Sequence, residues 1–166
     1  MLAREARAVS YRVFTIDIVN WKHHFDSALE PDVADDFLNL STLSSRRLNR
    51  YICGRDFTIF MNPPFHLACE FVDAAMHLGA RKIVCFQRQA WRESIGRQDW
   101  FAANRPARVY TCASRATCWR FDKPERTEGG NGSKVAHSFY VWERGHNGIE
   151  AHDVISRADC VEAKLR

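Results

Sequence analysis

Four consecutive residues, Asn62-Pro63-Pro64-Phe65, combine a side-chain amide, two prolines and an aromatic ring. A side-chain amide oxygen and a neighbouring backbone carbonyl can both accept hydrogen bonds from an NH2 group, and an aromatic ring can stack on a flat heterocycle. Tandem prolines fix φ and donate no N–H, so they end a strand and hold such acceptors in one direction. The alternative is a plain strand-ending turn with Phe65 in the core.

An apolar strand and an amphipathic helix are expected on either side of this segment. Residues 56–61 form an apolar run, and residues 67–78 carry apolar side chains at helical spacing, with Gly79 as the stop. The pattern also predicts helices at residues 2–9 and 91–104 and strands at residues 12–19, 32–37, 82–86, 107–113 and 138–142. This alternation favours an α/β fold, with a mostly parallel sheet covered by helices on both faces.

Two polar side chains fall where predicted strands end. Asp17 lies near the end of the strand expected at residues 12–19, and Asn62 follows the strand expected at residues 56–61. In open parallel sheets, ligands bind beyond the carboxyl ends of the strands. We therefore expect both side chains at one edge of the sheet, as a candidate site. The alternative for Asp17 is a simple strand-ending turn.

The Asn-Pro-Pro-Phe segment, placed between a strand and a helix, resembles the Asn/Asp-Pro-Pro-Tyr/Phe signature of amino-group methyltransferases. These enzymes have a Rossmann-like class I S-adenosylmethionine-dependent fold. The resemblance implies that Asn62 and the Pro63 carbonyl accept hydrogen bonds from a target amine. It also implies that Pro64 stiffens the turn and that Phe65 stacks on an extruded base. Such bonds raise electron density on the nitrogen as the methyl group arrives.

The resemblance assigns roles to further residues. Asp17 matches the acidic residue that binds the ribose hydroxyls of S-adenosylmethionine, and Ile18 would then lie against the cofactor's adenine. Asp36 and Phe37 match a later acidic segment that meets the adenine amino group. Phe139 lies in a late aromatic strand like that of phage-type adenine methyltransferases, where it would wall the target-base pocket. Core packing is the alternative role for Phe139.

The N-terminal region departs from the family pattern. Such enzymes place a central first strand and a Gly-rich loop for the methionine moiety before the first helix, whereas Met1 already lies at the start of that expected helix. The resemblance covers residues 2–144. We therefore expect an incomplete methyltransferase-like domain over residues 1–144, with a gap in the sheet, and a C-terminal tail over residues 145–166.

Composition bounds the class and the location of the protein. Its 166 residues, 46% hydrophobic and 12% aromatic, fit one globular domain. No apolar run approaches the ~18 residues that cross a bilayer, and the N-terminus lacks the apolar core of a signal peptide. We therefore expect a cytoplasmic protein without a membrane partner. The six cysteines and seven histidines lack ligand spacing, so no metal site is expected.

A basic stretch runs from Arg88 to Arg126. It holds nine basic and four acidic residues, with Trp91, Trp100 and Trp119 among them, in a chain whose net charge is only +4. Basic residues interleaved with aromatic ones suit a phosphate backbone, so the stretch favours a nucleic-acid partner, DNA above all. The alternative is a solvated charged face with tryptophans in the core.

The leading interpretation is an S-adenosylmethionine-dependent methyltransferase that acts on an exocyclic amine, adenine N6 in DNA, and is of phage or prophage type. Two alternatives remain. A protein glutamine or an RNA amine shares the same motif, and a vestigial domain would bind nucleic acid without catalysis. The sequence shows no target-recognition domain that separates these acceptors.

Overall fold

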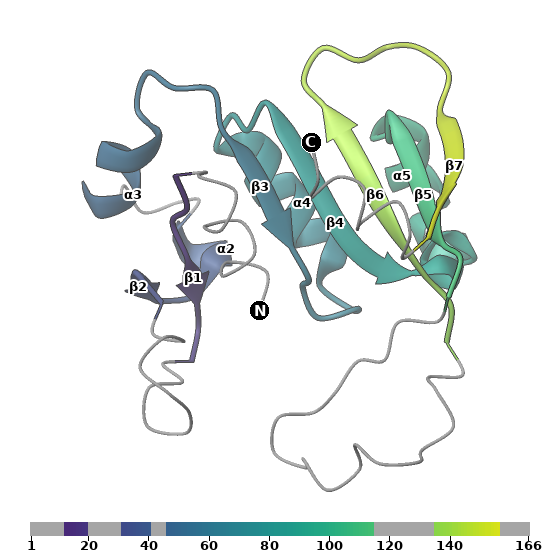
Figure 1. The fold of residues 1–166 in the computed structure, drawn as a ribbon, viewed down its shortest axis with the longest axis horizontal. Helices are drawn as coiled ribbons and strands as arrows, with labels where there is room; N and C mark the ends of the chain where they lie inside the picture. Colours follow the sequence, from purple (N-terminus) through teal and green to yellow (C-terminus); the bar gives the residue numbers. More distant parts are fainter. Residues whose placement is uncertain (1–11, 20–30, 41–45, 115–134, 157–166) are drawn as a thin grey trace, which may run out of the picture.

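The protein is described by a computed structural model that covers residues 12–19, 31–40, 46–114 and 135–156 (Figure 1). Its strands are β1 (Ile16–Asp17), β2 (Val33–Ala34), β3 (Thr58–Met61), β4 (Lys82–Arg88), β5 (Arg108–Cys112), β6 (His137–Glu143) and β7 (Ala151–Ile155). Its helices are α2 (Phe37–Leu40), α3 (Arg46–Ile52), α4 (Ala68–His77) and α5 (Gln98–Ala103), with 3₁₀ turns η3 (Gln89–Arg92) and η4 (Ile95–Arg97). The helix expected at residues 2–9 lies outside the described residues.

The main sheet has five strands in the order β3-β4-β6-β5-β7. The strands of the pairs β3–β4 and β5–β7 run parallel, whereas β6 runs antiparallel to both of its neighbours. The mixed α/β class expected from the sequence is confirmed. The sheet is less uniformly parallel than expected, because β6 enters it in the opposite direction.

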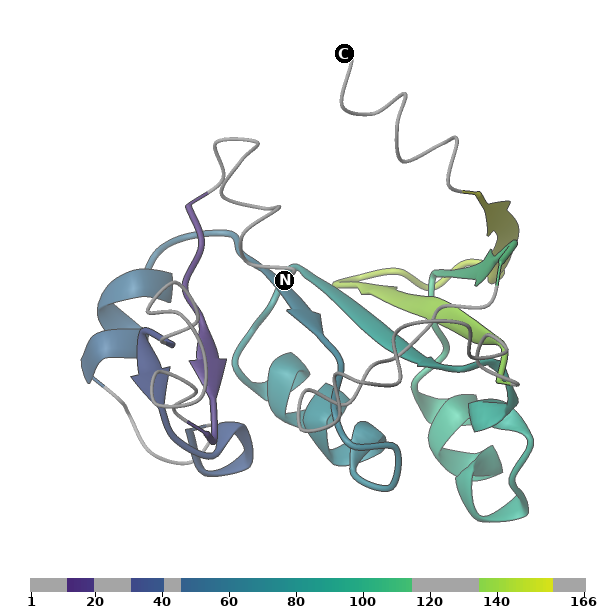
Figure 2. The ribbon, with the colours of Figure 1, turned by 60° about the horizontal axis from the view of Figure 1, so that its bottom comes forward.

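Helices α4 and α5 lie on one face of this sheet (Figure 2). Alternation along β4 sets the two faces: Ile83 and Cys85 are buried in the core, whereas Val84 and Phe86 on the other face are half-buried. The sequence predicted helices on both faces. In the part of the chain that the structure describes, α4 and α5 share a single face.

Helix α4 forms because its apolar residues recur at helical spacing. Ala68, Val72 and Ala75 are almost fully buried against the sheet. Full burial of a valine side chain stabilises a fold by about 1.5–3 kcal/mol, so Val72→Asp would break this packing. The helix ends at His77, and Gly79 follows it with a φ of 78° that favours glycine; the Gly79 N–H donates to the Met76 carbonyl at 2.9 Å.

Strands β1 and β2 form a separate, two-stranded parallel sheet. Asp32 fastens it, because its Oδ2 accepts hydrogen bonds from the Thr15 backbone N–H and hydroxyl, both at 2.7 Å. The sequence predicted a gap in the sheet, and among the described residues no strand ladder joins β1 to β3. Figure 1 shows β1, β3 and β4 pointing the same way.

The helix expected at residues 91–104 is broken into η3, η4 and α5. The interruption falls at Ser94, whose backbone is extended at φ −140° and ψ 123°. Gly96 follows, and glycine is a poor helix former. The strand expected at residues 32–37 is also shorter than predicted, because the chain leaves β2 after Ala34 and enters α2.

Strand β7 lies within the segment expected to be a tail. It pairs in parallel with β5 at the edge of the main sheet, so this sheet extends beyond residue 144. Four of its five residues are exposed. A strand that is exposed on both faces carries no hydrophobic alternation, which explains why the sequence pattern did not predict it.

An aromatic core holds the sheet to α5 and η3. Trp91, Phe101, Tyr140 and Trp142 are buried, and Trp91 meets Phe101 and Tyr140 edge to face at ring-centroid distances of 4.9 and 5.1 Å. The Tyr140 hydroxyl and the Trp142 indole donate to backbone carbonyls at 2.9 Å, whereas the buried Trp91 Nε1 has no hydrogen-bond partner among the described residues. This core fixes the strands β4 and β6, which carry the residues described next.

Candidate active site

The Asn-Pro-Pro-Phe segment forms the turn between β3 and α4, as the sequence predicted. The Leu67 N–H donates to the Pro64 carbonyl at 3.0 Å and closes the turn. Asn62 is exposed, and its side chain makes no hydrogen bond to another described residue. The turn therefore presents the Asn62 amide to solvent, as an acceptor for a ligand requires.

The Pro63 carbonyl has a partner that the sequence analysis missed. Its oxygen accepts a hydrogen bond from Gln87 Nε2 at 3.0 Å, and Gln87 is fully buried in β4. The sequence does contain a signal for Gln87: it is a polar residue in an apolar strand, and it lies two and four residues after Cys85 and Ile83, on the same face. A polar side chain that is buried in a sheet requires a hydrogen-bond partner, so such a residue indicates a specific contact elsewhere in the fold.

Phe65 lies at the surface of the turn. Its side chain is 38% exposed, and the Arg88 guanidinium lies 4.1 Å from the ring centroid. Such a cation over a ring is attracted by about 0.5–2 kcal/mol. The alternative of a core Phe65 does not match this exposure. The Arg88 guanidinium therefore already lies over a face of the Phe65 ring.

An aromatic row connects this turn to the sheet face opposite α4 and α5. The His137 ring lies 6.4 Å from Phe65 and stacks on Phe86 at 4.9 Å. Phe139 contacts Phe86 at 4.8 Å and Phe60 at 5.8 Å. The predicted pocket residue Phe139 thus lies in the row and is linked to Phe65 through Phe86 and His137.

His137 is a neutral member of the site. It is 3% exposed, and this burial lowers the pKa of its imidazole. A backbone hydrogen bond at Val135 raises the pKa, and the nearby charge of Arg88 lowers it again. The imidazole is therefore uncharged at neutral pH. Arg88 carries the positive charge beside Phe65.

Asp17 and Ile18 end β1 in an open position. Asp17 is exposed, and its Oδ1 accepts a hydrogen bond from the Val19 N–H at 3.0 Å. Ile18 is 68% exposed. Asp17 is the last residue of β1 and Asn62 follows β3, and the arrows of these two strands point in the same direction in Figures 1 and 2.

Asp36 and Phe37 have structural partners. Asp36 Oδ1 accepts the Leu38 N–H at 3.0 Å at the start of α2. The Phe37 ring stacks on Phe71 of α4 at 5.3 Å. Asp36 and Phe37 therefore have roles in capping and packing.

The structure brings together Asn62, Pro63, Phe65, Gln87 and Arg88.

Two hollows lie at the other end of the main sheet. One, of about 760 Å³, is lined by Asp56, Gly79 and Arg144 among others, and one of about 490 Å³ includes Asn104 and His146. Their residues lie before or at the start of β3, β4 and β5, or at and after the end of β6. They therefore lie at the opposite strand ends from Asn62.

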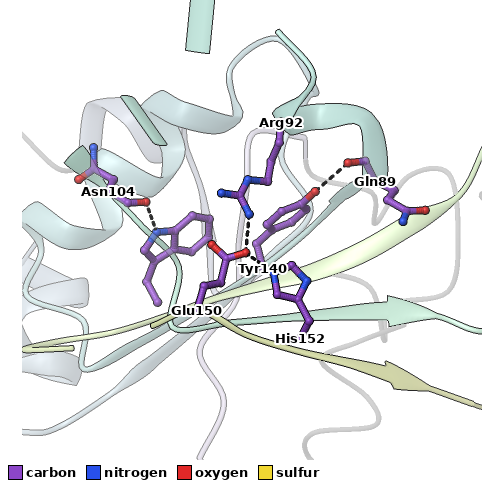
Figure 3. A network of polar contacts seen from close by, with 7 residues as sticks. Gln89, Arg92, Asn104, Tyr140, Glu150 and His152 are labelled. Carbon is purple, nitrogen blue, oxygen red and sulfur yellow. Dashed lines mark hydrogen bonds and ion pairs between the residues drawn. The ribbon is translucent and has the colours of Figure 1, made fainter. Parts of the chain in front are cut away.

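Arg92, in the basic stretch, is half-buried and takes part in a network of polar contacts (Figure 3). Its guanidinium contacts Glu150, whose side chain is only 9% exposed, and His152 Nε2 reaches the same oxygen at 2.7 Å. Figure 3 shows these side chains beside Tyr140, whose hydroxyl bonds to Gln89. The network fastens β7 to η3, so Arg92 has a structural role.

Other members of the stretch are also engaged. Arg97 Nε donates to the Trp91 carbonyl at 2.8 Å, and Arg108 lies 3.4 Å from Glu143. Trp91 is in the core, as the alternative interpretation of this stretch held. Arg115, Trp119, Arg120, Lys123 and Arg126 lie outside the described residues.

The described residues contain no group of three potential metal ligands, and none of their helices is long and apolar enough to span a membrane. Burial raises the pKa of the Cys69 thiol to about 11 and that of Cys85 to about 12. Both stay protonated at neutral pH and are poor metal ligands.

No protein-family model, no curated protein and no solved structure matches the chain.

Proposed function

We propose that this chain is a methyltransferase domain that transfers the methyl group of S-adenosylmethionine to an exocyclic amine, adenine N6 in DNA being the favoured acceptor. One observation carries the proposal: the exposed Asn62 amide, the Pro63 carbonyl and the half-open Phe65 ring lie together after a sheet strand. These are the three groups that an amine-activating site needs.

The chemistry follows from the acceptors. An exocyclic amine is a poor nucleophile because its lone pair is delocalised into the ring. Asn62 Oδ1 accepts one N–H and the Pro63 carbonyl accepts the other, and Phe65 stacks on the base. The nitrogen then forms a bond to the methyl carbon as the sulfonium–carbon bond breaks. The surplus amine proton leaves to solvent beside the exposed Asn62.

The strand arrangement supports this function. Sheets of the class I methyltransferase fold contain a late strand that runs antiparallel between two others, and β6 has this place between β4 and β5. Open α/β sheets bind ligands beyond the carboxyl ends of their strands, where Asn62 lies in the main sheet; Asp17 is the last residue of β1 in the separate two-stranded sheet. Fold likeness alone does not establish function, so the residues of the turn carry the functional assignment.

Only some of the residues predicted to bind S-adenosylmethionine are placed to do so. Asp17 offers an exposed carboxylate that can accept two ribose hydroxyls, and Ile18 offers an exposed apolar surface for an adenine ring. Asp17 Oδ1 and Asp36 Oδ1 each accept the N–H two residues on, but Asp17 is exposed whereas Asp36 is half-buried, and Phe37 is stacked on Phe71. Asp17 and Ile18 are therefore the residues that we propose hold the nucleoside.

The experiment incubates the full chain with methyl-labelled S-adenosylmethionine and adenine-containing DNA, RNA or protein, and identifies the methylated product by mass spectrometry. We expect N6-methyladenine in DNA, severe loss in Asn62→Ala, and wild-type turnover in Asn49→Ala, an exposed asparagine on α3. Methylation of RNA or of protein glutamine instead would change the acceptor and keep the chemistry. Near-normal turnover in Asn62→Ala would defeat the proposal.

A further inference from the structure

Gln87 is a polar side chain in an apolar place. It is fully buried on the core face of β4, in step with Ile83 and Cys85, and it ranks among the largest fully buried side chains. Burial of an amide costs free energy unless its hydrogen bonds are replaced. Its Nε2 donates at 3.0 Å to the Pro63 carbonyl, 24 residues earlier in the chain.

We infer that Gln87 is a positioning residue for methyl transfer: it fixes the Pro63 carbonyl so that the oxygen's second lone pair accepts one hydrogen of the target amine. The inference rests on the proposed function. Gln87 does not touch the acceptor base. It acts through the carbonyl to which it is bonded.

The backbone around Pro63 explains why one bond is sufficient. The Pro63 ring fixes φ, and the following Pro64 confines Pro63 to extended values of ψ. The remaining freedom is a small tilt of the peptide plane between the two prolines. A donor from the rigid sheet removes that tilt. A carbonyl has two lone pairs, so one remains for a ligand.

The orientation of the Gln87 amide is set by its partner. The Pro63 oxygen can only accept, so the atom that faces it is the NH2 group. Gln87 Oε1 is buried and has no hydrogen-bond partner among the described residues. Ser138 lies opposite Gln87 in the β4–β6 register, and its Oγ is likewise buried without a partner there. Ser138→Ala is therefore a matched control, because it removes a buried polar group that makes no bond to the turn.

The kinetic test uses two substitutions. Gln87→Met keeps a linear side chain and removes the donor, so we expect kcat to fall by about tenfold or more, since small misplacements of reacting groups cost up to about 100-fold. KM for DNA and KM for the cofactor should stay within about twofold of the wild-type values. A substitution that weakened ground-state binding would raise KM by more than this. In Gln87→Glu only the protonated carboxyl donates, so kcat should rise as pH falls. Ser138→Ala should retain the wild-type kcat.

A structural test separates this inference from the proposed function. In protein labelled with 15N-glutamine and 13C-proline, a through-hydrogen-bond coupling should join the Gln87 side-chain nitrogen to the Pro63 carbonyl carbon, and it should vanish in Gln87→Met. Absence of the coupling in the wild type overturns the inference whatever the activity. An active wild type with unchanged kcat and pH dependence in both variants overturns the inference alone. A wild type that shows the coupling and methylates no acceptor overturns the proposed function and, with it, the role of Gln87 in catalysis.

Discussion

The turn after β3 and the turn after β1 both end a strand, but they are supported very differently. The β3 turn has its Pro63 carbonyl tied to a fully buried side chain of the five-stranded sheet. At the β1 turn, Asp17 is exposed and bonds to the Val19 N–H two residues on, in a sheet of two short strands. The first turn is braced by a side chain buried in the five-stranded sheet, whereas the second is held within the two-stranded sheet, where the Asp35 N–H donates to the Asp17 carbonyl at 3.0 Å.

This difference corresponds to what the two proposed roles need. Amine activation requires acceptors held to within a fraction of an ångström, which favours a buried brace. A carboxylate that binds ribose hydroxyls tolerates a more open setting, because the ligand itself orders the contact. We therefore expect substitutions at the β3 turn to act on kcat and substitutions at the β1 turn to act on cofactor affinity.

The largest effect is expected from the core that braces the β3 turn. Trp91→Ala removes the ring that joins Phe101 to Tyr140, and such truncations cost about 3–5 kcal/mol. Urea unfolding should show this loss, and hydrogen exchange should show faster exchange in β4. Ile95→Ala is the control, because Ile95 is 88% exposed and its truncation should change stability by less than about 0.5 kcal/mol. Equal losses in both variants would contradict the braced core.

Phe65→Ala should have the next largest effect. Loss of base stacking costs about 1–3 kcal/mol, so affinity for DNA should fall by about 5- to 150-fold, as measured by fluorescence anisotropy. Phe65→Tyr keeps the ring face and should restore binding. The stability of the fold should change little, because Phe65 is partly exposed. Full affinity in Phe65→Ala would show that the ring does not stack on the base.

Asp17→Ala should lower the affinity for S-adenosylmethionine by about tenfold, because it removes one charge-assisted pair of hydrogen bonds. The kcat at saturating cofactor should be retained. Isothermal titration gives the Kd, and Asp153→Ala, another exposed aspartate, is the control. Bound cofactor at ~100 times its Kd should also stabilise the wild type by ~2.7 kcal/mol. A Kd unchanged by Asp17→Ala would remove this residue from the cofactor site.

The smallest effect concerns pH. Burial lowers the pKa of His137 below the ordinary value of about 6.5 for an imidazole, so the unfolded chain binds this proton more readily than the folded chain. The free energy of unfolding should therefore fall as pH drops below about 6.5. His137→Phe keeps a ring against Phe86 and should reduce that pH dependence, as measured by urea titrations at several pH values. An identical pH dependence in the variant would refute a buried neutral imidazole.

Local patterns predicted the placement of the turn. The apolar run before Asn62 and the helical spacing after it are local signals, and both elements are present at β3 and α4. Gln87 could not be assigned from the sequence, because its role depends on the packing of β4 against a turn 24 residues away. Asp36 and Phe37 matched a family segment, but the chain there enters α2 and uses them for a cap and for packing.

The central claim is tested most directly by the single-turnover rate of methyl transfer to adenine in DNA. This rate is measured for the wild type, Asn62→Leu and Asn62→Asp. Leucine keeps the approximate volume without an acceptor, whereas aspartate keeps the acceptor. We predict that Asn62→Asp forms N6-methyladenine, and that Asn62→Leu is slower than the wild type by about 100-fold or more, comparable to loss of an oxyanion-hole donor, while the fold is intact. Equal rates for the wild type and Asn62→Leu would contradict the claim that this amide activates the amine.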